Sequence, residues 1–146
     1  KAEEVLAVAD ADAALSDDSG LMVDALGGAP GVHSARYAGE GHDDAANNAK
    51  LLAAMQDVPE NARACQFVSA IALARRGRET LIRRGEVEGM LLRAPRGQAG
   101  FGYDPLFYYV PAGKTFAEMD ASEKNSISHR KRGLEAIREA LAAEQA

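Results

Sequence analysis

The sequence predicts an α/β protein in which a mixed, elongated β-sheet is flanked by helices. The strongest observation is a long apolar segment, residues 64–74, whose two faces are both mostly small or apolar, as in a central strand covered on both sides. A basic turn at residues 75–78 follows, and residues 79–88 return as a second strand, which is typical of an antiparallel hairpin. Two segments with apolar residues at helical spacing, one before and one after this hairpin, supply the helices.

The N-terminal part predicts the end of a helix and a short strand. Residues 1–10 are rich in good helix formers and have one apolar face but no N-cap, so we expect a helix that starts before residue 1. Residues 13–15 predict a short buried strand that leads into a turn at Asp17 and Asp18. The apolar residues 21–23 continue the chain after this turn.

The later elements are recognised by their ends. Residues 43–56 form the clearest internal helix, and Asp43 is its expected cap. We expect a strand at residues 106–110 and one helical turn at residues 115–120. Ser128 is the expected N-cap of the last helix.

The composition favours a single ordinary globular domain over residues 1–146. The chain is 47% hydrophobic and 27% charged, and its net charge of −5 does not favour non-specific binding to nucleic acid or to anionic membranes. Its single cysteine, Cys65, lies in an apolar segment and cannot form an internal disulfide, which agrees with a reducing, cytoplasmic location.

The adjacent carboxylates Asp17 and Asp18 are the first candidate for chemistry. Neighbouring Asp side chains repel each other unless a positive group lies near them. A magnesium ion bound by one or two carboxylates together with substrate phosphates would be such a group. The alternative is structural: both residues cap a turn, and the glycine-rich residues 27–31 that follow form a plain loop.

The segment Gly100-Phe101-Gly102-Tyr103-Asp104-Pro105 is the second candidate. Two glycines leave the Phe101 ring uncrowded, so that one face can stack on a flat ligand such as a base, and Asp104 can accept hydrogen bonds from ring N–H groups. The alternative is a tight turn with Phe101 and Tyr103 packed into the core.

Basic residues at the start of the last helix are the third candidate. Lys124, His129 and Arg130 cluster there, although cations are unfavourable at a helix N-terminus. Their placement therefore indicates a function, such as reading carbonyl or phosphate oxygens of a ligand. The alternative is a pair of solvated basic residues on a first helical turn.

Five sequence blocks, in order along the chain, resemble the Ham1/RdgB family of inosine triphosphate pyrophosphatases, also called dITP/XTP or non-canonical purine NTP pyrophosphatases. The resemblance covers essentially all 146 residues. The blocks are DDSGL at 17–21, VDALGGAPGVHSARYAG at 23–39, GFGYDPLF at 100–107, KTFAE at 114–118 and EKNSISHR at 123–130.

The resemblance implies a fold, a reaction and partners. Members of this family hydrolyse ITP, dITP and XTP to the nucleoside monophosphate and pyrophosphate, use Mg²⁺, and so remove non-canonical purine nucleotides from the nucleotide pool. They have the elongated sheet expected here and are commonly homodimers. A purine nucleoside triphosphate is therefore the implied ligand, with no nucleic acid or membrane partner.

The resemblance also implies the roles of individual residues. Asp18 matches the family's proposed base and metal ligand, and Asp17 is a second metal-site carboxylate in a supporting electrostatic role. Phe101 would stack on the base, and Arg130 would donate to the 6-keto oxygen of the purine. The other residues implied to contact the substrate are Ser19, Gly102, Tyr103, Asp104, Lys124 and His129.

The chain departs from the family pattern at its start. Family members begin with a strand and a Ser/Thr-x-Asn-x-x-Lys loop that binds the triphosphate, followed by a segment whose Glu helps to hold the metal; we expect these parts to be missing here. Lys1 takes the place of the family's helix lysine near the phosphates. The alternative to an active enzyme is therefore a truncated, inactive fragment that binds purine nucleotides or has a structural role.

Overall fold

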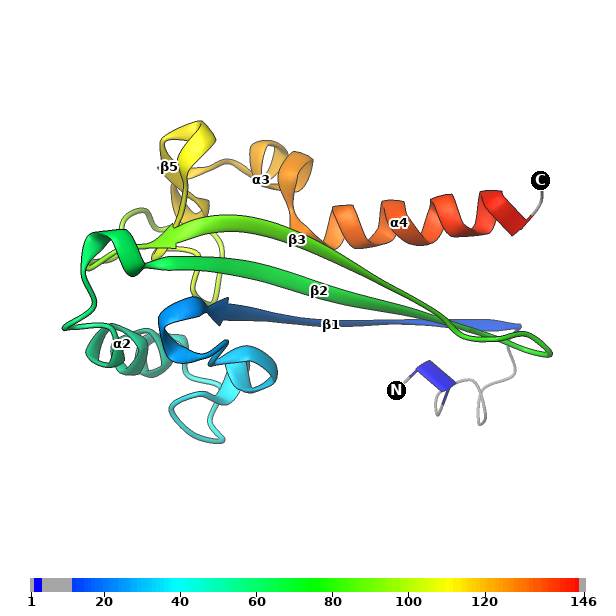
Figure 1. The fold of residues 1–146 in the computed structure, drawn as a ribbon, viewed down its shortest axis with the longest axis horizontal. Helices are drawn as coiled ribbons and strands as arrows, with labels where there is room; N and C mark the ends of the chain where they lie inside the picture. The colour runs from blue at the N-terminus through cyan, green and yellow to red at the C-terminus, as the bar shows by residue number, and fades with distance from the viewer. Residues whose placement is uncertain (1, 4–11, 145–146) are drawn as a thin grey trace. The chain divides into compact units, whose positions relative to one another are not determined.

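Five strands form one sheet in the order β1-β2-β3-β4-β5 in the computed structural model, which describes residues 2–3 and 12–144 (Figure 1). The strands are β1 (Ala13–Val23), β2 (Ala64–Arg75), β3 (Leu81–Leu91), β4 (Phe107–Tyr109) and β5 (Lys114–Thr115). The longer helices are α2 (Asp44–Ala54), α3 (Ala121–Ile127) and α4 (His129–Glu144), and the described residues also form five short 3₁₀ helices.

The α/β class and the long hairpin agree with the prediction. A five-residue turn joins the neighbouring strands β2 and β3, so this pair is antiparallel, because parallel neighbours need a much longer crossover. The β3–β4 and β4–β5 pairs are antiparallel as well. The sequence predicts a mixed sheet, which contains at least one parallel pair of strands. The pairs β2–β3, β3–β4 and β4–β5 are instead all antiparallel.

The contacts within the chain define two units, which are described separately. Unit 1 consists of Lys1–Ser19, Val68–Glu86 and Ser128–Ala146, and unit 2 consists of Gly20–Phe67 and Val87–Ile127. Strands β1, β2 and β3 each contribute residues to both units.

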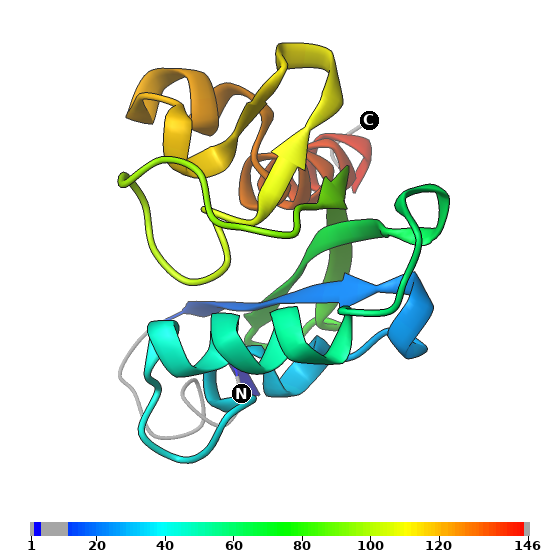
Figure 2. The same ribbon diagram turned by 90° about the vertical axis from the view of Figure 1, so that its left-hand side faces the viewer.

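Unit 2 contains a large apolar core built on three aromatic rings. The ring centroids of Phe67 and Phe107 are 4.4 Å apart, those of Phe107 and Phe116 are 4.7 Å apart, and those of Phe67 and Phe116 are 5.5 Å apart. Cys65 and Phe67 are buried on one face of β2, as the alternation of the sequence predicts. In the same unit the 3₁₀ helix Gly31–Arg36 lies beside α2, and the Asn47 side chain donates to Ala35 O at 2.9 Å (Figures 1 and 2).

Unit 1 packs α4 directly against two strands. Gly85 of β3 approaches α4 so closely that a Cβ atom at this position would lie 2.1 Å from His129 O and 2.3 Å from Gly133 N. Gly133 in turn faces Ile71 of β2. Glycines at both positions therefore let the helix backbone approach the strand backbone.

The expected helix caps are confirmed. Asp43 Oδ1 accepts a hydrogen bond from Ala46 N–H at 3.2 Å where α2 begins, and Ser128 Oγ accepts one from Lys131 N–H at 3.1 Å where α4 begins. The single turn expected near residue 115 is a 3₁₀ helix, Phe116–Glu118. None of the helices among the described residues has the length and apolar character needed to cross a membrane.

One local prediction is wrong, and another lies outside the described residues. Asp17 and Asp18 do not form a turn, because β1 continues through them to Val23. A strand tolerates Asp17 here because the protein supplies hydrogen-bond and ion-pair partners for its carboxylate. Of the helix expected over residues 1–10, only Ala2 and Glu3 are described, and they are helical.

Candidate functional site

Asp17 is the centre of a polar cluster in unit 1. Its Oδ1 atom accepts hydrogen bonds from Ser19 Oγ at 2.7 Å and from Ser69 Oγ at 2.6 Å, and the two hydroxyls are 3.0 Å apart. Its Oδ2 atom lies 2.6 Å from Arg130 Nε at the start of α4. β1, β2 and α4 thus each contribute a residue to the polar cluster around the Asp17 carboxylate.

These contacts lower the pKa of Asp17 below its ordinary value. Burial alone would raise the pKa, but the hydrogen bonds from Ser19 and Ser69 and the charge of Arg130 together outweigh it. The pair also explains how a cation is tolerated at the N-terminus of α4, because the carboxylate offsets the unfavourable interaction of Arg130 with the helix dipole. Two of the residues that the resemblance implies as substrate contacts, Ser19 and Arg130, both contact the Asp17 carboxylate. A third, His129, is the first residue of α4.

Asp18 does not belong to this cluster. It is exposed, and because successive side chains in a strand point to opposite faces, it points away from the face of Asp17 and Ser19. One ion therefore cannot bridge both carboxylates while β1 is extended, and Asp17 already has a cationic partner. The geometry thus gives Asp17 a cationic partner and leaves Asp18 exposed, and the expectation that Asp17 also binds the metal stays a prediction.

The fit of a magnesium ion therefore depends on Asp18. Within residues 2–3 and 12–144, no group of three or more His, Cys, Asp or Glu side chains is arranged to hold a metal ion. Mg²⁺ is nevertheless commonly held by one or two carboxylates with substrate phosphates and water as its other ligands. An exposed Asp18 fits this second arrangement and no all-protein cage.

The second cluster, in unit 2, is built on the loop that carries Phe101. The ring is 62% exposed, as its glycine neighbours predict. Gly100 and Gly102 have φ angles of +77° and +60°, and a Cβ atom at Gly100 would lie 2.2 Å from Asp104 Oδ2. Glycine is therefore required at Gly100 both by its backbone conformation and by the close approach of a carboxylate.

Asp104 and Lys124 hold this loop through hydrogen bonds to the buried Asp104 carboxylate. Asp104 is buried, and its Oδ2 atom accepts hydrogen bonds from Phe101 N–H at 3.1 Å and from Lys124 Nζ at 2.5 Å. The same Nζ atom lies 4.5 Å from the centroid of the Phe101 ring. The structure thus unites an exposed aromatic ring, a cation and a buried carboxylate, which are the groups that a flat, polar ligand requires.

Tyr103 lies in the core and supports the loop. Its hydroxyl donates to Ser34 O at 2.6 Å, and burial, together with the nearby Tyr37 and Asp44, raises its pKa. The alternative of a packed turn therefore holds for Tyr103 and not for Phe101. Lys1 lies outside the described residues.

Three residues of these clusters were not expected from the sequence. Ser69 looked like one more small residue in a buried strand, and its partner Asp17 is 52 positions away. Asp44 and Asn48 of α2 contact Gly102, although the sequence marks α2 only by its cap and apolar stripe. No local spacing in the sequence reports these contacts.

An antiparallel sheet with helices, a carboxylate–guanidinium pair and a separate glycine-flanked aromatic loop define the α/β class of this chain and its two polar clusters. The chain belongs to the Ham1 family, whose model matches residues 1–140. The family assignment confirms the resemblance of the five sequence blocks to this family.

Individual relatives agree with this assignment. The chain is 59% identical over 121 residues to a protein of Syntrophobacter fumaroxidans named dITP/XTP pyrophosphatase, a match that covers 83% of this chain and 51% of that protein. It is similar to the solved structure of the Staphylococcus aureus Ham1 protein, with a TM-score of 0.86 and 40% identity over 91% of this chain and 68% of that one.

It is also similar to a solved structure from Mycobacterium abscessus described as a nucleoside-triphosphatase / dITP/XTP pyrophosphatase. The TM-score is 0.80 and the identity 46%, over 92% of this chain and 68% of that one. The chain spans 51%, 59% and 64% of the length of three curated relatives that it matches.

Proposed function

We propose that the protein carrying this chain is a nucleoside triphosphate pyrophosphatase that hydrolyses ITP, dITP and XTP to the monophosphate and pyrophosphate. Family membership and relatives named dITP/XTP pyrophosphatase support this proposal. The proposal concerns the whole protein, because the chain spans only part of its relatives. The observation that carries it is the exposed Phe101 ring with Lys124 against it.

In this proposal the purine base stacks on Phe101, and Lys124 supplies a cation and hydrogen-bond donors beside the ring. Arg130 is assigned to the 6-keto oxygen of hypoxanthine or xanthine, with Ser19 and His129 as further contacts. Adenine carries an amino group where these bases carry the oxygen, so a site built from donors would leave them unpaired and reject ATP.

Asp18 is the proposed general base, because its exposed carboxylate is able to accept a proton from an attacking water molecule. We propose Mg²⁺ as the cofactor, held by the substrate phosphates and, through a water molecule, by Asp18, because one carboxylate cannot easily bind the metal directly and also accept the proton; the ion would offset the charge of the triphosphate. Asp17 acts on Arg130 in this scheme and not on the metal. A cytoplasmic homodimer is the proposed state of the protein, in line with its family and with the single cysteine of the chain.

A second candidate is a nucleotide-binding protein without turnover. The observation that favours it is the exposed Phe101 ring with Lys124 against it, because a base can bind there without any catalytic group. Such a protein would bind IMP through the Phe101 loop and release no pyrophosphate from ITP.

The test measures pyrophosphate release from ITP and from ATP by the full-length protein, whose intact mass is measured on the same sample to verify its length. We expect Mg²⁺-dependent release from ITP and little from ATP.

Asp18→Asn should lower kcat by at least about 100-fold while IMP affinity changes little, since a general base typically contributes 10²–10⁴-fold. Asp57→Asn, which removes an exposed carboxylate elsewhere, is the matched control. Near wild-type kcat in Asp18→Asn would contradict the assignment of the base, and absence of turnover in the wild type would favour the second candidate.

A further inference from the structure

We propose that Asp44 and Asn48 of α2 form a clamp on Gly102 that sets the position of the Phe101 ring for stacking on the base. Both are positioning residues, since they touch the loop and not the substrate. The inference rests on the proposed function, because the ring is given its role there.

The clamp holds both sides of one glycine. Gly102 N–H donates to Asp44 Oδ2 at 2.9 Å, and Asn48 Nδ2 donates to Gly102 O at 2.9 Å. Asp44 and Asn48 are four residues apart in α2, so their side chains lie one turn apart on the same face of the helix. A rigid element thereby grips the backbone directly after Phe101.

The grip matters because no other described residue packs against the side-chain face of Gly102. Gly102 has a φ angle of +60°, and a Cβ atom at this position would have no neighbour within 4 Å. A glycine without close neighbours has the greatest backbone freedom of any residue. The backbone before the ring is already held, because Phe101 N–H donates to Asp104. The clamp holds the backbone after the ring, so that hydrogen bonds fix the chain at Phe101 itself and at Gly102.

The side-chain amide of Asn48 has one buried oxygen, Oδ1, without a hydrogen-bond partner among the described residues, and the clamp explains why an amide is nevertheless present. Leaving a buried acceptor unpaired lowers the stability of the folded protein, whereas an apolar side chain of similar shape would avoid this loss. The amide is therefore retained for its donor, which holds Gly102 O.

Helix capping is a simpler explanation for Asp44, but another residue already caps α2. Asp43 Oδ1 accepts the hydrogen bond from Ala46 N–H at the helix start. Asp44, one position later, has its carboxylate on Gly102 N–H. The two neighbouring carboxylates thus have separate roles, and Asp43 provides a matched control for loss of helix stability alone.

The test uses steady-state kinetics of the full-length protein with ITP. Asn48→Leu and Asp44→Ala should each raise KM by about tenfold with kcat changed less than about threefold, because stacking on the ring is the same in the ground state and the transition state. Asp44→Asn keeps an acceptor for Gly102 N–H and should restore KM to within about twofold of the wild type. Asp43→Ala should lower the Tm and leave KM unchanged.

A second measurement does not depend on turnover. Hydrogen exchange of the peptide covering residues 97–106 should become faster in Asn48→Leu and Asp44→Ala and remain unchanged in Asp43→Ala. Faster exchange without a rise in KM would overturn the inference, because the clamp would then be only structural. Unchanged exchange and unchanged KM would overturn it as well. A wild-type protein that neither hydrolyses ITP nor binds IMP would instead overturn the proposed function, and with it the inference that depends on it.

Discussion

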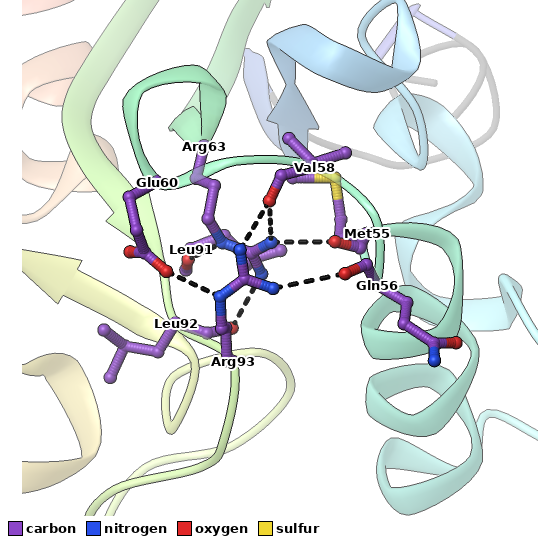
Figure 3. A network of polar contacts seen from close by, with 8 residues as sticks. All are labelled: Met55, Gln56, Val58, Glu60, Arg63, Leu91, Leu92 and Arg93. Carbon is purple, nitrogen blue, oxygen red and sulfur yellow. Dashed lines mark hydrogen bonds and ion pairs between the residues drawn. The ribbon is translucent and has the colours of Figure 1, made fainter.

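Arg63 shows how one residue joins segments of unit 2 that are distant in sequence. Its side chain is 1% exposed and has no carboxylate within its hydrogen-bonding set; instead it donates to four main-chain carbonyls (Figure 3). These belong to Met55, Val58, Leu91 and Leu92, at N–O distances of 2.8, 3.1, 2.8 and 3.2 Å. The guanidinium thus links the residues at the C-terminal end of α2 to the residues at the end of β3 by hydrogen bonds. Burial, and then the neighbouring charge of Arg93, lowers its pKa.

Replacing Arg63 by Met should therefore destabilise the protein strongly. Four buried or partly buried carbonyls lose their donor, so we expect the free energy of unfolding to fall by about 3 kcal/mol. Urea unfolding measures the change. Arg93→Met is the control, because Arg93 is about half exposed and contacts the same turn through Glu60, Gln56 and Val58 (Figure 3); it should cost less than about 1 kcal/mol. Equal losses in the two variants would contradict this account of Arg63.

Cys65 should be chemically inert in the native protein. Its side chain is fully buried, and burial, followed by the negative charge of Asp24, raises its pKa to about 12. Because only the thiolate reacts, disulfide reagents at pH 8 should modify the folded chain far more slowly than the unfolded chain in urea. Native labelling as fast as in urea would show that the thiol is accessible.

Residue-level chemistry was predictable only where it depends on neighbours in the sequence. The exposure of Phe101 was predicted because the flanking glycines remove crowding. The role of Arg63 was not, because its acceptors lie 5 to 29 positions away along the chain. For the same reason the ion pair of Asp17 with Arg130, whose partners are more than a hundred positions apart, was not predicted.

At the scale of elements, the sequence predicts segments whose signals are local. The caps of α2 and α4 and the strand of residues 64–74 were found because a cap or an alternating pattern spans a few residues. The sequence predicts a turn within β1 where the strand continues, and the reason is physical. The alternation continues through Asp17, Asp18 and Ser19, but it is an alternation of polar side chains, which the apolar pattern does not reveal.

Gly85 provides a test of how β3 and α4 of unit 1 fit together. In Gly85→Ala the new Cβ atom would meet main-chain atoms of His129 and Gly133, which cannot rotate away as a side chain can. The helix must shift, and we expect a loss of at least about 2 kcal/mol in the free energy of unfolding. Arg130, at the start of the same helix, should lose part of its contact with Asp17.

The control is Gly41→Ala, because a Cβ atom at Gly41 would have no neighbour within 4 Å and its φ is not in the left-handed region. This change should be neutral within about 1 kcal/mol. Thermal unfolding of both variants checks the prediction. A neutral Gly85→Ala would mean that α4 does not depend on this close approach.

At the scale of the whole molecule, the two units differ in what holds their described residues together. Unit 2 has the large aromatic and aliphatic core, with Phe67, Phe107 and Phe116 at its centre. In unit 1, ion pairs tie α4 to the strands: Glu144 of α4 pairs with Arg75 and Arg78 beside the β2–β3 turn, and Asp17 pairs with Arg130. Three strands continue through both units, so a purely local reading of the sequence does not reveal the division.

Ion pairs in both units make stability depend on pH in a defined direction. The pKa of Asp17 is lowered as described above, that of Glu118 is lowered by Thr115 N–H and then by Arg96, and that of Glu144 by Arg75 and Arg78. A carboxylate with a lowered pKa in the folded state binds a proton more weakly there than in the unfolded chain. Its stabilising contribution is therefore complete above the unfolded values of 3.8 for Asp and 4.5 for Glu, and is lost as the pH falls through the folded values.

We accordingly expect the free energy of unfolding to be nearly constant with respect to these three groups above about pH 5.5 and to fall steadily as the pH is lowered from there to about 2.5. The triple variant Asp17→Asn, Glu118→Gln, Glu144→Gln should be less stable than the wild type at pH 7 but lose less stability on acidification, so that the two curves converge at low pH. Urea titrations across this range measure both curves. Glu88→Gln, which neutralises one exposed carboxylate, controls for the change in net charge. Parallel curves for the triple variant and the wild type would show that these carboxylates do not determine the acid limit, and their ion pairs would then contribute little to the stability of either unit.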